Sequence, residues 1–184
     1  MLIIGVVGQI ASGKGILVKY LNEKLGFVSF SLSSIVHAEL NKSGIKKFTR
    51  QTLQDIGDEL RRRNGDDILT RRLYEVIKGQ NHERIVIEGI RNPAEIEFLK
   101  KNANFILIGV KSKSELRFKR LLSRGKPWDP KNYNDFKKVD RRDLGTGQDK
   151  SGQQVGKCLA YCDYMLTNNK DIKDFERKIE KLKI

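Results

Sequence analysis

Cysteine and histidine are scarce in this sequence, which contains two of each. Cys158 and Cys162 stand four residues apart in a segment with a helical pattern, so they share one helix face and make no disulfide framework. His37 and His82 have no metal-ligand spacing with each other or with the cysteines. The sequence therefore predicts two buried thiols, and it predicts neither a disulfide-stabilised fold nor a structural metal site.

Long hydrophobic runs are also missing, and none approaches the roughly 20 residues of a membrane-spanning helix. The sequence begins directly with an apolar segment, without a basic region or a cleavage site, so no secretory signal is expected. Internal repeats, low-complexity segments and domain linkers are absent as well. We therefore predict one domain over residues 1–184, in a cytoplasmic protein that is a monomer or homodimer and does not bind membranes.

Acidic residues are outnumbered, with 23 Asp and Glu against 37 Lys and Arg, and the net charge is +14. Such an excess attracts polyanions, whether nucleotides, coenzymes or RNA. The basic residues are spread along the chain, and no aromatic-rich RNA-binding motif accompanies them. A small nucleotide is therefore the favoured partner, and nucleic acid stays an alternative.

Strand and helix patterns alternate from end to end, which predicts an α/β fold with a mostly parallel sheet. Apolar runs predict strands at 2–7, 27–30, 84–89, 105–110 and 164–167. Helical periodicity is found at 16–25, 35–40, 53–60, 68–78, 93–98, 155–161 and 172–182, and a basic helix that ends at Arg124 follows the segment 111–115.

The first strand leads into the most informative motif. Gly8 to Lys14 fits G-x-x-x-x-G-K between a strand and a helix, which is the context that a P-loop requires. Loop N–H groups and the helix N-terminus would converge on phosphates, and Lys14 would supply a positive charge. The predicted contacts to a nucleotide are Gly8, Ala11, Ser12, Gly13, Lys14, Gly15 and Ile16.

One position departs from the common P-loop. Gly15 stands where most P-loops have the Ser or Thr whose hydroxyl binds Mg²⁺. Phosphates, waters and a distant carboxylate would then have to hold the metal. Glu88 lies at the carboxyl end of the strand predicted at 84–89, in the manner of a Walker B acid, so it is the candidate either for the Mg²⁺ site or for a general base.

Arg91 follows that strand in a loop at the edge of the sheet where ligands bind. Its guanidinium suits a phosphate, and the alternative is a surface ion pair with a neighbour such as Glu95. The serines at 31–34 can cap the next helix or leave N–H groups toward a ligand, and Ser33 is assigned to substrate binding.

A strongly basic helix precedes a segment of changed composition. Arg117, Arg120 and Arg124 lie on one face of this helix, where they could absorb charge in a transfer reaction or form a solvated stripe. Residues 125–147 combine Pro, Gly and paired charges with a short helix through Phe136 and Val139, which suggests a mobile flap. Arg141 in this flap is assigned to substrate binding.

These motifs occur in a recognisable order: Gly-Lys-Gly at 13–15, Ile-Glu-Gly-Ile-Arg-Asn-Pro at 87–93, the basic helix that ends at Arg124, and Asp-Tyr-Met-Leu-Thr-Asn at 163–168. The chain thereby resembles the P-loop nucleoside-monophosphate-kinase-like proteins over nearly its whole length. It is most similar to a branch that includes dephospho-CoA kinase and archaeal adenylate-kinase-like proteins.

The resemblance implies a three-layer α/β/α P-loop fold with a five-stranded parallel sheet, a substrate-binding segment at about 31–64 and a lid at about 123–147. It implies ATP and Mg²⁺ as cofactors. Lys14 would bind the ATP phosphates, Arg120 and Arg124 would flank the transferring phosphoryl group, Arg91 would meet the acceptor, and Asn168 would border the adenine. Ser33 and Ser34 stand where relatives often have an acid, and Gly15 and Ile16 replace hydroxyl residues.

The leading hypothesis is an ATP-dependent kinase that acts on a nucleoside or deoxynucleoside monophosphate. A dephospho-CoA kinase-type transfer to a 3′-hydroxyl is the close alternative. A nucleotide-dependent switch that binds RNA or the ribosome is an alternative from another class, favoured by the charge and by the arginine clusters at 61–63, 71–72 and 141–142.

Overall fold

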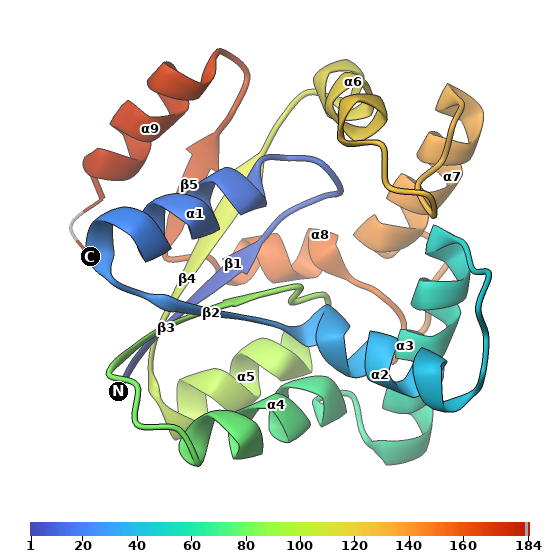
Figure 1. The fold of residues 1–184 in the computed structure, drawn as a ribbon, viewed down its shortest axis with the longest axis horizontal. Helices are drawn as coiled ribbons and strands as arrows, with labels where there is room; N and C mark the ends of the chain where they lie inside the picture. The colour runs from blue at the N-terminus through green and yellow to red at the C-terminus, as the bar shows by residue number, and fades with distance from the viewer. Residues whose placement is uncertain (183) are drawn as a thin grey trace.

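The computed structural model describes residues 1–182 and 184, and within them a sheet of five parallel strands forms the middle layer. The strand order is β2-β3-β1-β4-β5. Figure 1 shows helices on both faces of this sheet, so the expected three-layer α/β/α fold is confirmed. The strands are β1 (Leu2–Val7), β2 (Val28–Ser31), β3 (Arg84–Glu88), β4 (Asn104–Lys111) and β5 (Tyr164–Thr167).

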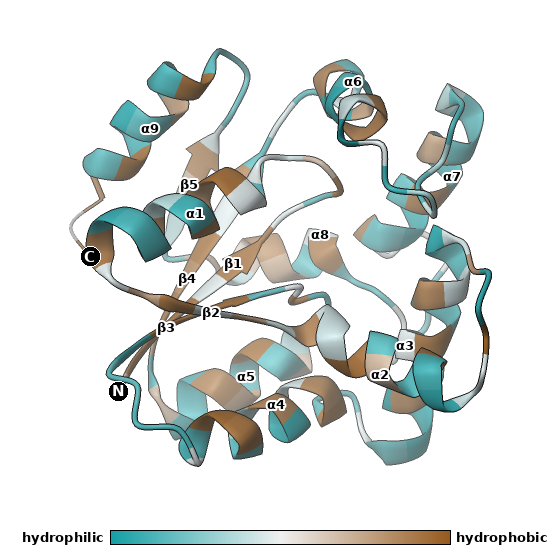
Figure 2. Cartoon of the chain, in the orientation of Figure 1, coloured by the Kyte–Doolittle hydropathy of each residue, from teal (hydrophilic) through white to brown (hydrophobic). Residues whose placement is uncertain are grey.

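Alternating apolar residues on the strands build a core on each face of the sheet. Ile3 and Ile85 face one layer of helices, whereas Ile4 and Val86 face the other, and all four are fully buried. Figure 2 shows the hydrophobic sheet between helices whose outer faces are hydrophilic. This burial on both sides explains why β1 reads as a continuous apolar run in the sequence.

Helices α1 (Lys14–Leu25) and α9 (Ile172–Glu180) cover one face of the sheet. The elements that pack on the other face are α2 (Leu32–Lys42), α3 (Arg50–Asn64), α4 (Ile68–Lys78), α5 (Pro93–Asn102) and α8 (Val155–Cys158), which continues as the 3₁₀ turn η1 (Leu159–Tyr161). Helices α6 (Ser114–Arg124) and α7 (Tyr133–Leu144) pack together beside the sheet through Leu121 and Phe136.

The segment at 125–147 is more regular than the sequence indicated. Residues 140–144, expected in a loop after a short helix, form the last turns of α7. Asn132 caps the start of this helix, Phe136 is fully buried against α6, and Gly145 ends the helix at a φ of 103°. The helix is stabilised by contacts with residues far away in the sequence, which its polar composition did not reveal.

The register of the sheet brings the functional segments together. Val6 of β1 pairs with Glu88 of β3, so the loop after β1 and the acid at the end of β3 meet at the same edge. Ligands of open parallel sheets bind at this carboxyl edge. Among the described residues, no helix combines the length and the apolar character that crossing a membrane requires.

Candidate active site

The loop between β1 and α1 has the backbone of an anion-binding nest. Ala11 adopts a φ of 58°, in the left-handed region that side chains rarely enter, and Gly13 follows in that region at 111°. Turns of this kind direct successive N–H groups to one side, and the N-terminus of α1 adds its dipole there. The loop is therefore shaped to bind phosphate.

The two glycines of the motif are also needed for packing. A Cβ atom on Gly8 would lie 2.3 Å from the carbonyl oxygen of Val110, and one on Gly13 would lie 2.1 Å from the amide nitrogen of Asn168. Any side chain at either position would push the loop away from β4 and from the turn after β5. The glycines thus permit the turn and the close approach of the backbone at once.

Lys14 lies at the centre of the site. Its Nζ donates hydrogen bonds to the carbonyl oxygens of Gly8, at 2.6 Å, and of Gln9, at 2.9 Å. Burial and the neighbouring charge of Arg91 lower the pKa of Lys14 from 10.5 to about 7, although Asp143 and Glu88 oppose this effect. A phosphate bound beside Nζ would supply negative charge and raise this pKa again.

A cleft of about 630 Å³ opens beside this loop, and we call it the P-loop cleft. It is lined by Ala11, Ser12, Gly13, Lys14, Gly15, Ile16, Glu88, Arg120, Arg124, Lys126, Asn168, Lys170, Asp171 and Ile172. The structure thus brings together the residues predicted to contact the nucleotide, except Gly8, which does not line the cleft. The predicted phosphate-binding arginines, Arg120 and Arg124, lie on the same cleft.

Asn168 has a second role that its position in the sequence did not disclose. Its Nδ2 donates to the carbonyl oxygen of Ser12 at 3.1 Å, and its Oδ1 accepts from Arg120 at 3.2 Å. Arg120 also donates to Ser112 Oγ and to the backbone oxygen of Asn168. Asn168 therefore links the P-loop to the basic helix α6, and it is almost fully buried.

A second, smaller cavity of about 160 Å³ is also lined by Lys14, and we call it the inner cavity. Its charged lining consists of one acid, Glu88, and the cations Lys14, Arg50, Arg61, Arg91, Arg124 and Lys126. Its uncharged lining includes Ser31, Ser33, Val36, His37, Leu53, Gln54, Leu69, Trp128 and Gln153. The excess of cations favours a small, multiply charged anion.

The guanidinium of Arg91 lines the inner cavity and pairs with Asp143 of α7. The alternative expectation of a surface ion pair with Glu95 is wrong, because Glu95 is fully buried and receives the backbone N–H of Arg91 instead. Pro93 opens α5 and the capping box of Asn92 with Glu95 fixes its start, so the backbone before the helix is held rigidly. Arg91 is thereby aimed at the cavity.

Asp129 holds two more arginines of the inner cavity in place. It accepts hydrogen bonds from Arg124 Nε at 2.6 Å and from Arg50 at 2.8 Å. Burial works against the charged form of Asp129, but these hydrogen bonds outweigh burial and lower its pKa. Arg50, Lys126, Asp129 and Asp143 were not singled out from the sequence, and only their tertiary neighbours distinguish them from ordinary surface charges.

Arg117 does not belong to the site, although its spacing placed it beside Arg120 and Arg124. It is almost fully buried and forms a two-pronged ion pair with Asp140 of α7, at 2.5 and 2.8 Å. Asp140 also accepts a hydrogen bond from Gln9 of the P-loop. This ion pair fastens α6 and α7 to the loop, so both expected roles of Arg117, as a charge absorber and as a solvated residue, are wrong.

Two further predicted residues differ in their surroundings. Ser33 lines the inner cavity, and its hydroxyl lies 2.8 Å from that of Ser31. Arg141 is exposed and lines neither the P-loop cleft nor the inner cavity. The assignment of Arg141 to substrate binding therefore stays a prediction without a contact that supports it in this arrangement of α7.

The residues present fit Mg²⁺ only together with a nucleotide. Among the described residues, no group of three or more His, Cys, Asp or Glu side chains could hold a metal ion. Glu88 reaches both cavities, and Ser12 Oγ is fully buried in the P-loop without a hydrogen-bond partner. A metal at this edge would therefore depend on phosphate oxygens and water in addition to Glu88.

The chain resembles several known proteins over its full length, although no family profile matches it. A UPF0200 protein of Pyrococcus horikoshii is 32% identical over 186 residues, which cover 98% of this chain and 95% of the relative. A UPF0200 protein of Thermococcus sibiricus is 32% identical over 188 residues, which cover 98% and 93% of the two chains.

Solved structures share the fold at low sequence identity. The shikimate kinase of Bacteroides thetaiotaomicron is 14% identical with a TM-score of 0.57, and the match covers 97% of this chain and 94% of that one. The shikimate kinase of Acinetobacter baumannii in complex with shikimate is 16% identical with a TM-score of 0.55, over 97% and 90% of the two chains. The fold is therefore that of P-loop kinases.

Proposed function

We propose that this chain, which belongs to the UPF0200 family, transfers the γ-phosphoryl group of ATP to a nucleoside or deoxynucleoside monophosphate. One observation carries the proposal: the P-loop cleft and the inner cavity share Ala11, Lys14, Glu88, Arg124 and Lys126. Two binding spaces that meet at a P-loop lysine suit a donor and an acceptor held in line for transfer. The kinase fold of the structural neighbours supports the same class of reaction.

The chemistry would need little from the protein beyond position and positive charge. An oxygen of the acceptor phosphate attacks the γ-phosphorus, the bond to the β–γ bridging oxygen breaks, and ADP leaves. Lys14, Arg120 and Arg124 would neutralise the charge that spreads over the transferring group. Mg²⁺, held by the ATP phosphates with Glu88, would neutralise part of the same charge.

A phosphate acceptor would need no general base in the inner cavity. A phosphate monoester is already ionised at neutral pH, so its attacking oxygen has no proton to lose. A hydroxyl acceptor such as that of dephospho-CoA needs a general base. Among the described residues that line the cavity, Glu88 is the only carboxylate and His37 the only imidazole. Since cations outnumber these two groups there, a phosphate acceptor fits the lining better than a hydroxyl does.

Replacing Arg91 with alanine should raise the KM for the acceptor or lower kcat by about 10- to 100-fold, with little change in ATP affinity. Arg91 lines the inner cavity and not the P-loop cleft, so only the acceptor would lose its partner. Arg84→Ala is a matched control, because Arg84 is exposed and starts β3, at the end of the strand opposite to the loop that carries Arg91. A loss confined to ATP affinity would place Arg91 on the donor instead.

ATP binding should take up protons at pH 8. ATP phosphates beside Nζ raise the pKa of Lys14 from about 7 toward 10.5, so the group is mainly neutral in the free protein and charged in the complex between these values. Affinity should then fall as pH rises above 7. Calorimetry in buffers of different ionisation enthalpy should show uptake of about one proton by the wild type and none by Lys14→Met. Equal uptake by both would contradict the assignment.

The proposed function is tested by measuring ADP release from MgATP with a panel of ribo- and deoxynucleoside monophosphates and dephospho-CoA. One monophosphate should stimulate release far above background. Stimulation by dephospho-CoA alone would favour the 3′-hydroxyl transfer. No stimulation despite intact ATP binding would favour the RNA-associated switch.

The arginine clusters that favoured such a switch carry less free positive charge in the structure than the sequence suggested. Arg61 is buried against Glu95. Arg142 pairs with Asp55 and Asp58.

A further inference from the structure

A tight turn between α6 and α7 brings three side chains to the site. The N–H group of Asp129 donates to the carbonyl oxygen of Lys126 at 3.1 Å, which closes a four-residue turn with Pro127 at its second position. Lys126 lines both the P-loop cleft and the inner cavity, and Trp128 lines the inner cavity. Asp129 lines neither, and only 2% of its side chain is exposed. Any effect of Asp129 on the site must therefore pass through other side chains.

The partners of Asp129 are two arginines from separate helices. Arg124, the last residue of α6, donates from Nε to Oδ2 at 2.6 Å and from Nη2 to Oδ1 at 3.0 Å. Arg50, the first residue of α3, donates from Nη2 to Oδ1 at 2.8 Å, and its backbone N–H donates to the carbonyl oxygen of Trp128 at 2.9 Å. A two-pronged pair fixes the plane of a guanidinium as well as its place. The turn thereby fixes both arginines relative to each other.

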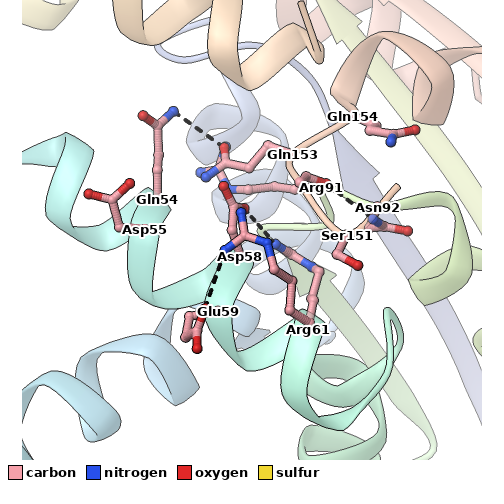
Figure 3. Close-up of polar contacts among 12 residues, drawn as sticks. Gln54, Asp55, Asp58, Glu59, Arg61, Arg91, Asn92, Ser151, Gln153 and Gln154 are labelled. Carbon is pink, nitrogen blue, oxygen red and sulfur yellow. Dashed lines mark hydrogen bonds and ion pairs between the residues drawn. The ribbon is translucent and has the colours of Figure 1, made fainter. Parts of the chain in front are cut away.

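The other two arginines of the inner cavity each have an acid of their own, as Figure 3 shows for Arg61 and Asp58. Arg50 and Arg124 instead share Asp129, which is their only carboxylate partner among the described residues. Burial and a neighbouring arginine lower the pKa of Arg50, and Asp129 opposes this effect. Without Asp129, these two cations would repel each other and would have no anion to hold them at the site.

We propose that Asp129 is a positioning residue for phosphoryl transfer, which holds Arg124 where the donor and acceptor spaces meet, an inference that rests on the proposed function. Arg124 lines both spaces, whereas Arg50 lines only the inner cavity. Arg124 ends α6 and is followed by Gly125, so the helix itself does not fix its long side chain, and Asp129 supplies the constraint. A charge that is held in place before the reaction stabilises the transferring phosphoryl group more than a charge that has to move.

The test compares Asp129→Asn in two backgrounds, with the monophosphate that stimulates ADP release as the acceptor. Asparagine keeps the shape of aspartate but has one acceptor oxygen and no charge, so it cannot accept from both Nε and Nη2 of Arg124. In the wild type, Asp129→Asn should lower kcat by about tenfold or more. In Arg124→Ala, whose own kcat should be lower, adding Asp129→Asn should change kcat by less than about threefold. The KM for the acceptor should rise at least about threefold in both backgrounds, because Arg50 loses its partner as well.

Asp135→Asn is the matched control. Asp135 lies in the first turn of α7, its side chain is 53% exposed, and it pairs with Lys138 at 3.3 Å. Its substitution should leave kcat and the KM values unchanged. If Asp129 served only the stability of the fold, Asp129→Asn would lower the melting temperature and reduce kcat by the same factor in both backgrounds, with unchanged KM values. That result would overturn the inference.

Two other results would contradict the role of Asp129 and leave the proposed function intact. A higher kcat or a lower acceptor KM in Asp129→Asn would show that this acid competes with the ligand for the arginines. An unchanged kcat in Arg124→Ala would mean that Asp129 has no catalytic cation to position. Failure of every acceptor to stimulate ADP release from the wild type would overturn both the inference and the proposed function.

Discussion

Lys14→Ala should lower kcat for phosphoryl transfer by at least about 10³-fold, the size of loss expected when a preorganised charge is removed from a transferring phosphoryl group. The ammonium group belongs to the P-loop and lines both the P-loop cleft and the inner cavity, so its loss would affect the donor and the acceptor sides together. The fold should survive. Burial already disfavours the charged form of Lys14, and the substitution removes no apolar contact of the core.

Lys19→Ala is the control for this experiment. Lys19 lies on the same helix, is 72% exposed in its side chain and pairs only with Glu23, at 3.8 Å. Its substitution should leave turnover and the melting temperature unchanged. Steady-state turnover and a thermal unfolding curve decide the question for both variants. Turnover of Lys14→Ala within tenfold of the wild type would remove the basis for the P-loop assignment.

Glu95→Gln should destabilise the fold by about 3–5 kcal/mol, the cost of leaving one member of a buried ion pair uncompensated. Glu95 Oε1 accepts from Arg61 at 3.1 and 2.8 Å, and Oε2 accepts the N–H groups of Arg91 and Asn92 at 2.7 and 3.0 Å. The amide of glutamine has one acceptor oxygen, so its NH2 group would face either Arg61 or the N–H groups of Arg91 and Asn92. Asp58, at 3.3 Å, would be the remaining carboxylate paired with Arg61, which is 1% exposed. The loss is a large part of the roughly 5–15 kcal/mol that stabilises a typical domain.

Urea unfolding measures this effect, and the same helix supplies the control. Glu97 is exposed and bonds only to Tyr161, so Glu97→Gln should change the free energy of unfolding by less than about 1 kcal/mol. Arg61→Met combined with Glu95→Gln should be less destabilising than the sum of the two single substitutions. Additive losses would show that the two side chains do not depend on each other.

The buried pair of Arg61 and Glu95 also holds the backbone of Arg91 in place, because Glu95 accepts the N–H group of Arg91. The sequence did not reveal this pair. Arg61 belongs to a run of three arginines, which indicates a solvated helix end, and Glu95 was considered only as a surface partner of Arg91. Their pairing joins α3 to α5 across 34 positions of the sequence. Binary patterning reports which face of a helix is buried, but it does not report which buried charges meet.

The prediction of the fold succeeded where the signal was local. Apolar runs identified β1 and the other strands to within a residue or two at each end, and the spacing of Gly8, Gly13 and Lys14 identified the nest, because these patterns depend on neighbours within one turn or one strand. The helical continuation of α7 through Asp143 was missed, because ion pairs of its residues Asp140 and Asp143 with the distant Arg117 and Arg91 stabilise it.

The sequence by itself determined the layer architecture, the P-loop and the acid at the end of β3, since period, glycine spacing and strand ends are properties of adjacent residues. Only the tertiary structure decided which charges serve the site. It placed Arg50 and Lys126 on the inner cavity, buried Arg117 against Asp140, and left the oxygen of Gln54 without a partner. The sequence shows which residues are charged or polar, but their partners depend on how the helices pack. An ion pair forms only between groups that the fold brings into contact, and a buried oxygen lacks a partner only when the fold brings no donor to it.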